Sequence, residues 1–261
     1  MTDIFHKNNK TKRLTGTDLQ ELADQCKYEF GIDDVEKVII DKEETDTDET
    51  PLLLPKGKFR MICCGRSGSG KTVLVLNLLL KYLKYDCLYV ICSTAKLQPK
   101  YDLICDLAEL FPSKFKIIDN LKNFSLKQLA KTKRNLILID DMQEMPSDQL
   151  LKVNDIFCRG RHSNCSVIYL AQTYYRVPIR ARGSANWFIF FKVNSEKDKT
   201  RIHKDVCGDL TKESFLKLFN EATEESEGAE PYSYFVVDTT EKNMCMRYRK
   251  NFRQLYLDNL E

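Results

Sequence analysis

Short apolar runs alternate with longer segments of helical spacing through most of this chain. The runs are four to six residues long and rich in Ile, Leu, Val, Phe and Cys, which is typical of strands that are buried on both faces of a sheet. Because helical segments separate the runs, the pattern predicts an α/β fold with a mostly parallel sheet and helices on both faces. The expected strands span residues 59–64, 87–92, 115–118, 136–141, 166–171 and 187–191.

Helical segments are expected between these strands, at residues 73–83, 99–110, 125–128 and 147–157. The first is apolar almost throughout, as in a helix buried in the core. Ser125 and Gln128 have the three-residue spacing of a capping box at a helix N-terminus. The stretch from Tyr174 to Arg182 shows neither pattern, and we expect a loop there.

The pattern divides the chain into three regions. Residues 1–54 form an N-terminal arm, in which a capping box at Thr17 begins an amphipathic helix and an acidic linker follows from Asp41. Residues 55–206 form the α/β core, and residues 207–261 form a C-terminal extension.

The C-terminal extension has its own local signals. Thr211 is expected to cap a helix, with a hydrophobic staple between Leu210 and Phe215. An acidic loop is expected at 221–230, and the last signal is a terminal hairpin, for which the two strands are residues 232–238 and 244–248.

A glycine-rich sequence, Gly-Arg-Ser-Gly-Ser-Gly-Lys-Thr, stands between the first expected strand and the first expected helix. It satisfies every fixed position of the Walker A pattern, G-x-x-x-x-G-K-[ST]. In such a loop the glycines let backbone N–H groups approach a phosphate, and the helix N-terminus adds partial positive charge. A glycine-rich turn that binds nothing is the weaker interpretation, because further motifs follow.

We therefore expect ATP and Mg²⁺ as ligands. Lys71 would reach the β- and γ-phosphates, and the Thr72 hydroxyl would ligate Mg²⁺. The expected nucleotide-binding residues are Gly65, Arg66, Ser67, Gly68, Ser69, Gly70, Lys71 and Thr72.

Two acids, Asp140 and Asp141, end the apolar run at 136–139 and form a Walker B strand. Carboxylates at the carboxyl end of a strand lie where open α/β sheets bind ligands. We expect Asp140 to hold Mg²⁺ and Asp141 to act as the general base toward the attacking water. Asp141 is one methylene shorter than the glutamate that is more usual in ATP-hydrolysing motors. Acids also begin many ordinary loops, an interpretation that the upstream Walker A motif disfavours.

Three further polar residues could complete the hydrolytic site. Gln172 ends the next strand, where it could sense the γ-phosphate or position water. Arg159 and Arg161 stand in the turn before that strand, and a planar guanidinium suits the spread charge of a phosphoryl transition state. In a ring of subunits either arginine could act on the nucleotide of the neighbour; a solvated basic turn is an equal alternative.

Charge is unevenly distributed along the chain. The formal net charge is +3, while residues 33–49 hold nine acids and two lysines, so the remainder carries +10. A basic body suits a polyanion partner, although lysines also serve solubility. In the expected loop Arg176, Arg180 and Arg182 accompany two tyrosines, a mixture that can hold a phosphate backbone and stack on bases. A subunit-contact loop is the alternative.

The ten cysteines favour a reducing, intracellular setting over a disulfide framework, because half of them lie inside apolar runs. Cys158, His162 and Cys165 lack the fourth ligand of a zinc site and are interpreted as structural. No run approaches the ~18 apolar residues of a membrane helix, and the first residues lack the apolar core of a secretory signal. We expect no membrane span.

Together these motifs resemble the FtsK–HerA superfamily of P-loop ATPases, and within it the genome-packaging ATPases of poxviruses, other large DNA viruses, virophages and related transposons. The resemblance covers roughly Phe59 to Lys192 and rests on GRSGSGKT, LILIDD, CRGRH and SVIYLAQ in that order. It implies a RecA-like sheet of the ASCE type, with one strand between the two Walker strands. It also implies a finger arginine at Arg159 or Arg161 and a sensor role for Gln172.

The resemblance further implies an ATP-hydrolysing translocase that works as a homo-oligomeric, hexameric ring around double-stranded DNA. Such a protein packages a genome into a capsid, with a capsid or portal-vertex protein as partner. It works inside the host cell, in the viral factory or the nucleus. The alternatives are a nucleoside or nucleotide kinase with both arginines in a phosphate-clamping lid, and another DNA-processing ATPase such as a helicase. A GTP switch ranks last, because no N-K-x-D motif is present.

Overall fold

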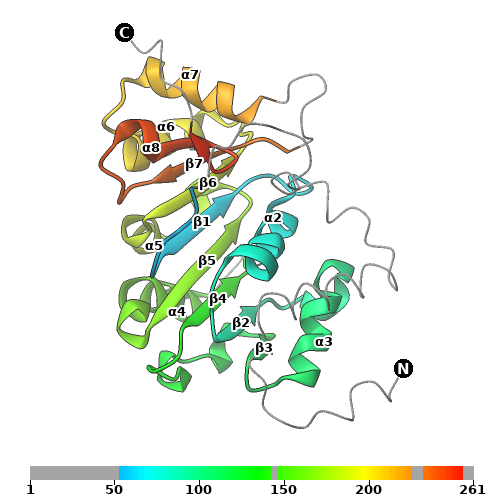
Figure 1. Ribbon diagram of the computed structural model, residues 1–261. Coiled ribbons are helices and arrows are strands. Elements are labelled where there is room, and N and C mark those ends of the chain that lie inside the picture. The colour runs from blue at the N-terminus through cyan, green and yellow to red at the C-terminus, as the bar shows by residue number, and fades with distance from the viewer. Residues whose placement is uncertain (1–52, 141, 143–145, 225–231, 255–261) are drawn as a thin grey trace.

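The structure is a computed structural model that describes residues 53–140, 142, 146–224 and 232–254. These residues form a nine-stranded sheet in the order β3-β2-β4-β5-β1-β6-β7-β8-β9 (Figure 1). The six strands from β3 to β6 in that order are parallel, and β7, β8 and β9 pair in antiparallel fashion. The strands are β1 Arg60–Cys64, β2 Cys87–Ile91, β3 Phe115–Ile118, β4 Asn135–Ile139, β5 Cys165–Ala171, β6 Trp187–Phe191, β7 Tyr234–Asp238, β8 Tyr248–Lys250 and β9 Arg253–Gln254.

Helices connect the strands and cover both faces of the sheet. The α-helices are α2 Lys71–Asn77, α3 Asp102–Leu110, α4 Ser147–Arg159, α5 Ile179–Ser184, α6 Glu196–Val206, α7 Lys212–Thr223 and α8 Met244–Arg247. A π-helical turn, η2 Leu78–Tyr82, continues α2. The 3-10 turns are η3 Ala95–Leu97, η4 Pro99–Tyr101, η5 Leu121–Asn123, η6 Leu126–Gln128, η7 Gly160–Ser163 and η8 Tyr174–Arg176.

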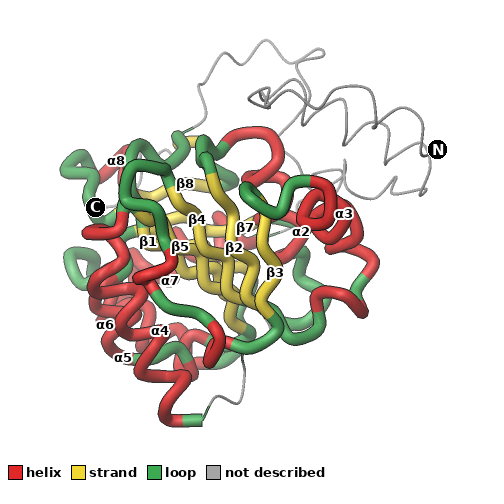
Figure 2. The backbone as a smooth tube through the Cα atoms, turned by 90° about the horizontal axis from the view of Figure 1, so that it is seen from below, coloured by secondary structure: helices red, strands yellow, loops and turns green. Residues whose placement is uncertain are grey.

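The core has two layers because alternate strand residues face opposite sides of the sheet. In β1, Met61 and Cys63 belong to the cluster that includes residues of α2 and α3, whereas Ile62 and Cys64 belong to the cluster that includes residues of α4, α6 and α7. Figure 2 shows the strands between these two groups of helices. Every residue of β2, β4, β6 and β7 is buried, as expected for a sheet that is covered on both faces.

The predicted fold class is confirmed: all six expected strands are present, the sheet is mostly parallel, and β5 lies between β1 and β4. This order brings the carboxyl ends of the two Walker strands, β1 and β4, to the same edge of the sheet, with only β5 between them.

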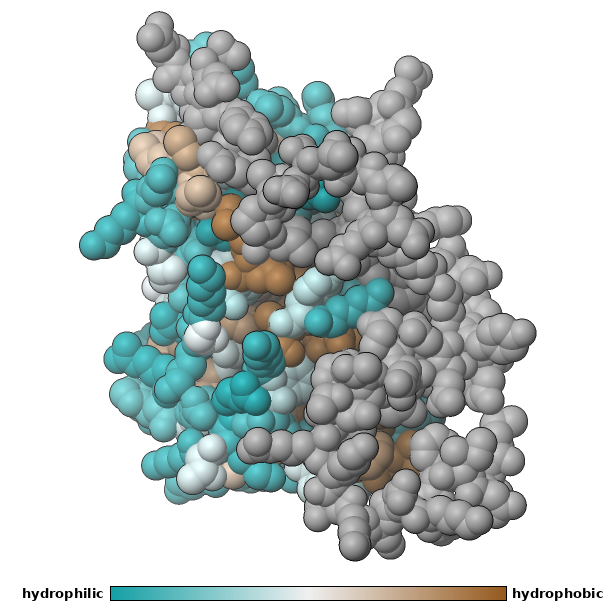
Figure 3. All heavy atoms as spheres, in the orientation of Figure 1, coloured by the Kyte–Doolittle hydropathy of each residue, from teal (hydrophilic) through white to brown (hydrophobic). Residues whose placement is uncertain are grey.

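Hydrophilic residues cover most of the described surface in the view of Figure 3, and hydrophobic residues gather in a band across its middle. Among the described residues no helix is both long and apolar enough to cross a bilayer.

Several local expectations were wrong in detail. The stretch expected as a loop contains η8 and the helix α5, whose six residues bury only Ala181 and Arg182, too few for a readable period. The capping box at Ser125 produces a single 3-10 turn, in which the Ser125 hydroxyl accepts from the N–H of Lys127. Helix α6 was not expected at all, because it is highly charged and buries just three side chains.

The C-terminal extension continues the same sheet. Thr211 caps α7 as expected, accepting from the N–H of Ser214 at 3.1 Å. The expected hairpin is confirmed in its pairing, because β7 and β8 pair in antiparallel fashion. The bounds of its second strand were wrong, because residues 244–247 form α8 and the strand begins at Tyr248. The expected acidic loop at 221–230 begins inside α7, and its residues 225–230 lie outside the described residues. The N-terminal helix and acidic linker also lie outside them.

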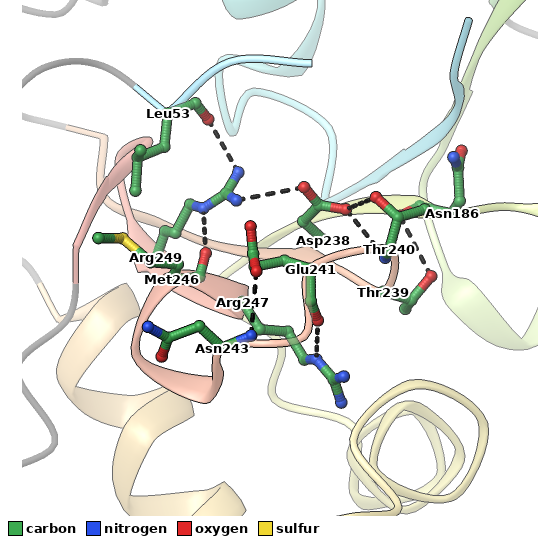
Figure 4. A network of polar contacts seen from close by, with 10 residues as sticks. All are labelled: Leu53, Asn186, Asp238, Thr239, Thr240, Glu241, Asn243, Met246, Arg247 and Arg249. Atoms are coloured by element: carbon green, nitrogen blue, oxygen red, sulfur yellow. Dashed lines mark hydrogen bonds and ion pairs between the residues drawn. The ribbon is translucent and has the colours of Figure 1, made fainter. Parts of the chain in front are cut away.

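Arg249 ties the extension to the segment that leads into β1 (Figure 4). Its guanidinium contacts Asp238 Oδ2 at 3.2 Å and donates to the carbonyl oxygens of Leu53 at 2.8 Å and Met246 at 2.6 Å. It also lies over the ring of Trp187, 4.7 Å from the ring centroid. Burial lowers the pKa of Arg249, while the carboxylate of Asp238 partly offsets this effect. A buried charge is therefore paired at the amino-terminal edge of the sheet.

Candidate nucleotide-binding site

The Walker A loop leaves the carboxyl end of β1 and enters α2 at Lys71. Its first residue, Gly65, donates its N–H to the carbonyl of Ala171 at 3.1 Å, which fixes the loop to the end of β5. Within the loop, the N–H of Ser69 donates to the carbonyl of Arg66 at 3.2 Å. Gly68 and Gly70 have φ angles of 77° and 84°, the left-handed region that glycine enters without steric cost.

Gly65 has a separate reason to be glycine. A Cβ atom there would lie 2.6 Å from the Ser69 hydroxyl oxygen and 2.8 Å from the Cβ of Phe191. At Gly70 a Cβ would lie 3.2 Å from the ring of Tyr232, which therefore borders the loop just before α2. The loop is thus closely packed on its inner side.

Lys71 lies at the start of α2 and is only 9% exposed. Its ammonium donates to the carbonyl of Arg66 at 2.7 Å, so the side chain folds back over its own loop. Burial lowers the pKa of Lys71, and the carboxylate of Asp140 opposes this shift. Cys63, beneath the loop, is fully enclosed, and burial raises the pKa of its thiol to about 12. The Cys63 thiol is therefore neutral at ordinary pH.

Thr72 and Asp140 come together from the two Walker motifs. The Thr72 hydroxyl donates to Asp140 Oδ2 at 3.2 Å, and both residues are less than 10% exposed. Hydroxyl and carboxylate oxygens are the ligands that Mg²⁺ prefers, so this donor set fits the metal that the sequence implies. When bound, Mg²⁺ would neutralise phosphate charge at this position. Asp141, the expected general base, lies outside the described residues.

Two residues that the sequence analysis missed also reach this pair. Tyr101 is fully buried and donates its hydroxyl hydrogen to Asp140 Oδ2 at 2.6 Å. The Lys100 ammonium donates to the Thr72 hydroxyl oxygen at 3.1 Å. Both come from η4, after β2, whose carboxyl end meets the same sheet edge as that of β4. That topology is the signal that could have identified them.

Gln172 follows the last residue of β5, the strand between β1 and β4. The backbone bond from Gly65 to Ala171 places Gln172 one residue from an anchor of the Walker A loop. Its side chain is exposed. Gln172 therefore lies at the carboxyl edge of the sheet, beside the start of the Walker A loop.

Arg159 and Arg161 lie at the opposite edge of the sheet. Arg159 ends α4 and pairs with Asp155 at 3.0 Å, and Arg161 lies in η7, which leads into the amino end of β5. Burial, and repulsion from Arg161, lower the pKa of Arg60, the first residue of β1. The Walker A loop leaves the other end of β1, roughly 15 Å away for a five-residue strand. The structure therefore does not bring these exposed arginines to the Walker residues of their own chain.

The three arginines expected at DNA have different environments. Arg176 and Arg180 are exposed, whereas Arg182 is 8% exposed and lies over the ring of Tyr174 at 5.2 Å. Arg182 also pairs with Asp205 at 3.6 Å. Its ion pair with Asp205 joins α5 to α6.

Among the described residues, which include Cys158, His162 and Cys165, no group of three or more His, Cys, Asp or Glu could hold a metal ion.

The sequence is similar to that of known viral proteins. The profile of the family described as "Poxvirus A32 protein" matches residues 52–249. The curated relatives called "DNA packaging protein OPG160" from variola virus and vaccinia virus (strain Copenhagen) are each 30% identical over 164 residues. The match covers 54% of this chain and 56% of each relative, so the chain spans about half the length of the curated relatives it matches.

Solved structures share the fold. The "genome packaging NTPase B204" of Sulfolobus turreted icosahedral virus 2, in complex with ATP-gammaS, superposes with a TM-score of 0.51 and 16% identity, over 76% of this chain and 98% of that chain. The "DNA-packaging ATPase" B204 of Sulfolobus turreted icosahedral virus gives a TM-score of 0.51 and 15% identity, over 75% and 97% of the two chains. Because the family profile spans most of the sequence and its region contains both Walker motifs, this chain belongs to the Poxvirus A32 protein family.

Proposed function

We propose that this chain is a Mg²⁺-dependent ATPase that translocates double-stranded DNA and packages a viral, or virus-like transposon, genome into a capsid. The observation that carries the proposal is the convergence of Lys71, Thr72 and Asp140 at the carboxyl edge of the sheet, with Thr72 and Asp140 3.2 Å apart. Lys71 and the loop N–H groups would bind the phosphates, while Thr72 and Asp140 would hold Mg²⁺. Asp141 would orient the water that attacks the γ-phosphate, and Gln172 would sense that phosphate.

The arginine placement supports a ring over a kinase. A nucleoside or nucleotide kinase would need Arg159 and Arg161 at the phosphates of their own chain, yet both lie at the other edge of the sheet. In a homo-oligomeric ring two different surfaces of the subunit meet at each interface, an arrangement that can place the arginine edge of one subunit at the nucleotide edge of the next. One of these arginines would then supply positive charge to the neighbour's γ-phosphate.

DNA as the substrate is supported by charge and by the relatives' names. Arg176 and Arg180 are exposed, and so is Tyr175, which precedes Arg176 in the sequence, a combination suited to a phosphate backbone. The relatives from variola and vaccinia virus are called DNA packaging proteins. Packaging further implies a capsid or portal-vertex partner and action inside the infected cell, in the viral factory or nucleus.

The test is the rate of ATP hydrolysis by the full chain with and without double-stranded DNA, in the presence of Mg²⁺. We expect duplex DNA to stimulate phosphate release, and a nucleoside acceptor to remain unphosphorylated. Phosphorylation of the nucleoside would support a kinase, and separation of a labelled duplex would support a helicase. ATP hydrolysis that ignores duplex DNA would contradict the translocase.

Two variants make this experiment specific. Lys71→Ala removes the ammonium at the phosphates and should abolish turnover. Lys81→Ala, in η2 outside the loop, is the matched control and should leave turnover unchanged. Normal turnover in Lys71→Ala would show that the hydrolysis comes from another site or a contaminant.

A further inference from the structure

The connection between β2 and α3 places a second lysine at the Walker residues. Lys100 is the middle residue of η4, and the next residue, Tyr101, is buried and bonded to Asp140 at 2.6 Å. Pro99 begins this turn, and its fixed φ angle restricts the backbone just before Lys100. The Lys100 backbone is therefore held beside the Walker B carboxylate, although its side chain is exposed.

The ammonium of Lys100 donates to the Thr72 hydroxyl oxygen at 3.1 Å, and that hydroxyl donates to Asp140 at 3.2 Å. Lys71 lies on the loop side of the same pair, bonded to the carbonyl of Arg66. Repulsion from Lys100 contributes to the lowered pKa of Lys71, after the larger effect of burial. Two lysines thus lie at this site, Lys100 on the Thr72 hydroxyl and Lys71 on the carbonyl of its own loop, although the Walker A pattern accounts for only one.

Lys100 cannot keep this position when Thr72 binds a metal. Mg²⁺ is ligated at about 2.0–2.1 Å, and an ammonium bonded to the same oxygen would repel the metal at short range. The long lysine stem allows the ammonium to move by several ångströms while its backbone stays in place. If Thr72 and Asp140 hold Mg²⁺ for bound ATP, phosphate oxygens would be the acceptors available to the displaced ammonium.

We propose that Lys100 is a second phosphate-binding lysine, which contacts the γ-phosphate of bound ATP and so favours ATP over ADP. The proposal rests on the nucleotide site proposed above and adds a residue that contacts the γ-phosphate. Lys71 folds back over its own loop, whereas Lys100 approaches from the side of Thr72, where the metal and the γ-phosphate would lie. An exposed lysine that merely bonds to a nearby hydroxyl would not distinguish the two nucleotides.

The experiment measures equilibrium dissociation constants of the full chain for ADP and for a non-hydrolysable ATP analogue, each with Mg²⁺. Lys100→Ala should weaken the affinity for the ATP analogue by about 10- to 100-fold, the effect of losing one charge-assisted hydrogen bond. The affinity for ADP should remain unchanged. Lys100→Arg should restore part of the preference. Lys96→Ala, which removes another exposed lysine of the same connection, is the matched control and should change neither constant.

Each other outcome has a definite meaning. An unchanged constant for the ATP analogue in Lys100→Ala, or an equal loss for both nucleotides, would overturn the γ-phosphate contact while leaving the nucleotide site intact. Failure of the unmodified chain to bind either nucleotide would refute the nucleotide site and, with it, the role of Lys100. Equal melting temperatures of Lys100→Ala and the unmodified chain would exclude a folding defect as the cause of any loss.

Discussion

Tyr101 donates its hydroxyl hydrogen to Asp140 across 2.6 Å, so the turn after β2 holds the carboxylate that follows β4. The two residues come from neighbouring parallel strands whose carboxyl ends meet at one edge of the sheet. A ligating carboxylate that is held by a hydrogen bond presents its oxygens to the metal in a fixed direction. Tyr101 is therefore a positioning residue for the proposed Mg²⁺ site.

Tyr101→Phe should raise the Mg²⁺ concentration required for half-maximal ATP hydrolysis by about 10-fold, the lower end of the effect of removing such a supporting bond. The phenylalanine ring keeps the buried packing, so the fold should persist. A Mg²⁺ titration of turnover at saturating ATP measures the effect. Tyr85→Phe is the control, because the Tyr85 hydroxyl is buried with no hydrogen-bond partner among the described residues. An equal Mg²⁺ requirement in both variants would remove the positioning role of Tyr101.

Asp141→Asn should separate nucleotide binding from hydrolysis. An amide keeps the size of the side chain but cannot accept the proton of water, and general bases typically contribute about 10²- to 10⁴-fold to a rate. We expect near-normal affinity for ATP and a single-turnover rate lowered by roughly that factor. Asp140→Asn, in contrast, should also raise the Mg²⁺ requirement. Unchanged hydrolysis in Asp141→Asn would assign the general base to another residue.

The elements that could be predicted from the sequence are those with a strong local signal. The buried strands and the Walker A loop were predicted because each is a contiguous run of residues with a strong local pattern. Helix α6 was missed because its buried residues, Asp198, Ile202 and Val206, include one carboxylate and leave little apolar period. Residues 244–248 were assigned to a strand because a single helical turn is too short to show periodicity.

The site was predicted where its residues belong to motifs and missed where strand order creates the contact. Thr72 and Asp140 were paired through known patterns, and they lie 3.2 Å apart. Lys100 and Tyr101 reach the same pair only because β2 lies next to β4 in the sheet, a relationship that no short motif encodes. Arg182 was grouped with Arg176 and Arg180 by spacing alone, and burial against Tyr174 and Asp205 separates it from them.

Gly65→Ala should damage the Walker A loop, because the new methyl would lie 2.6 Å from the Ser69 hydroxyl and 2.8 Å from the Cβ of Phe191. Forcing such contact costs about 1–3 kcal/mol of unfolding free energy, and the displaced loop should bind ATP more weakly. Gly183→Ala is the matched control, since nothing lies within 4 Å of its Cβ position in α5. Denaturant unfolding and ATP binding should both distinguish the variants; equal stability would contradict the close packing at Gly65.

Arg249→Met should destabilise the fold by about 3–5 kcal/mol, the effect of breaking a buried ion pair. The change leaves Asp238 without the guanidinium and the carbonyl of Leu53 without its donor (Figure 4). Arg134→Met removes an exposed ion pair with Asp86 and should cost less than about 1 kcal/mol. Denaturant unfolding measures both values. Equal losses would mean that Arg249 contributes no more than a surface pair.

Mixed assemblies test whether an arginine acts on the neighbouring subunit. Arg159 and Arg161 lie at the amino-terminal edge of the sheet and Lys71 at the carboxyl edge, so one subunit cannot supply both groups to one nucleotide. Arg161→Ala assemblies and Lys71→Ala assemblies should each hydrolyse ATP poorly. When the two are mixed, some interfaces combine an intact loop from one variant with an intact arginine from the other, and activity should return in part.

The same mixture made with Arg159→Ala decides between the two arginines. Arg159 already pairs with Asp155 at 3.0 Å in the same helix, and a guanidinium bound to its own carboxylate must give up that contact to reach a neighbour. Arg161 forms no ion pair with another described residue and lies near the like charge of Arg60, so we expect its substitution to have the larger effect and the clearer rescue. If neither substitution lowers turnover, no arginine of this turn acts across the interface. If turnover falls but mixing restores nothing, the loss arises within the subunit itself.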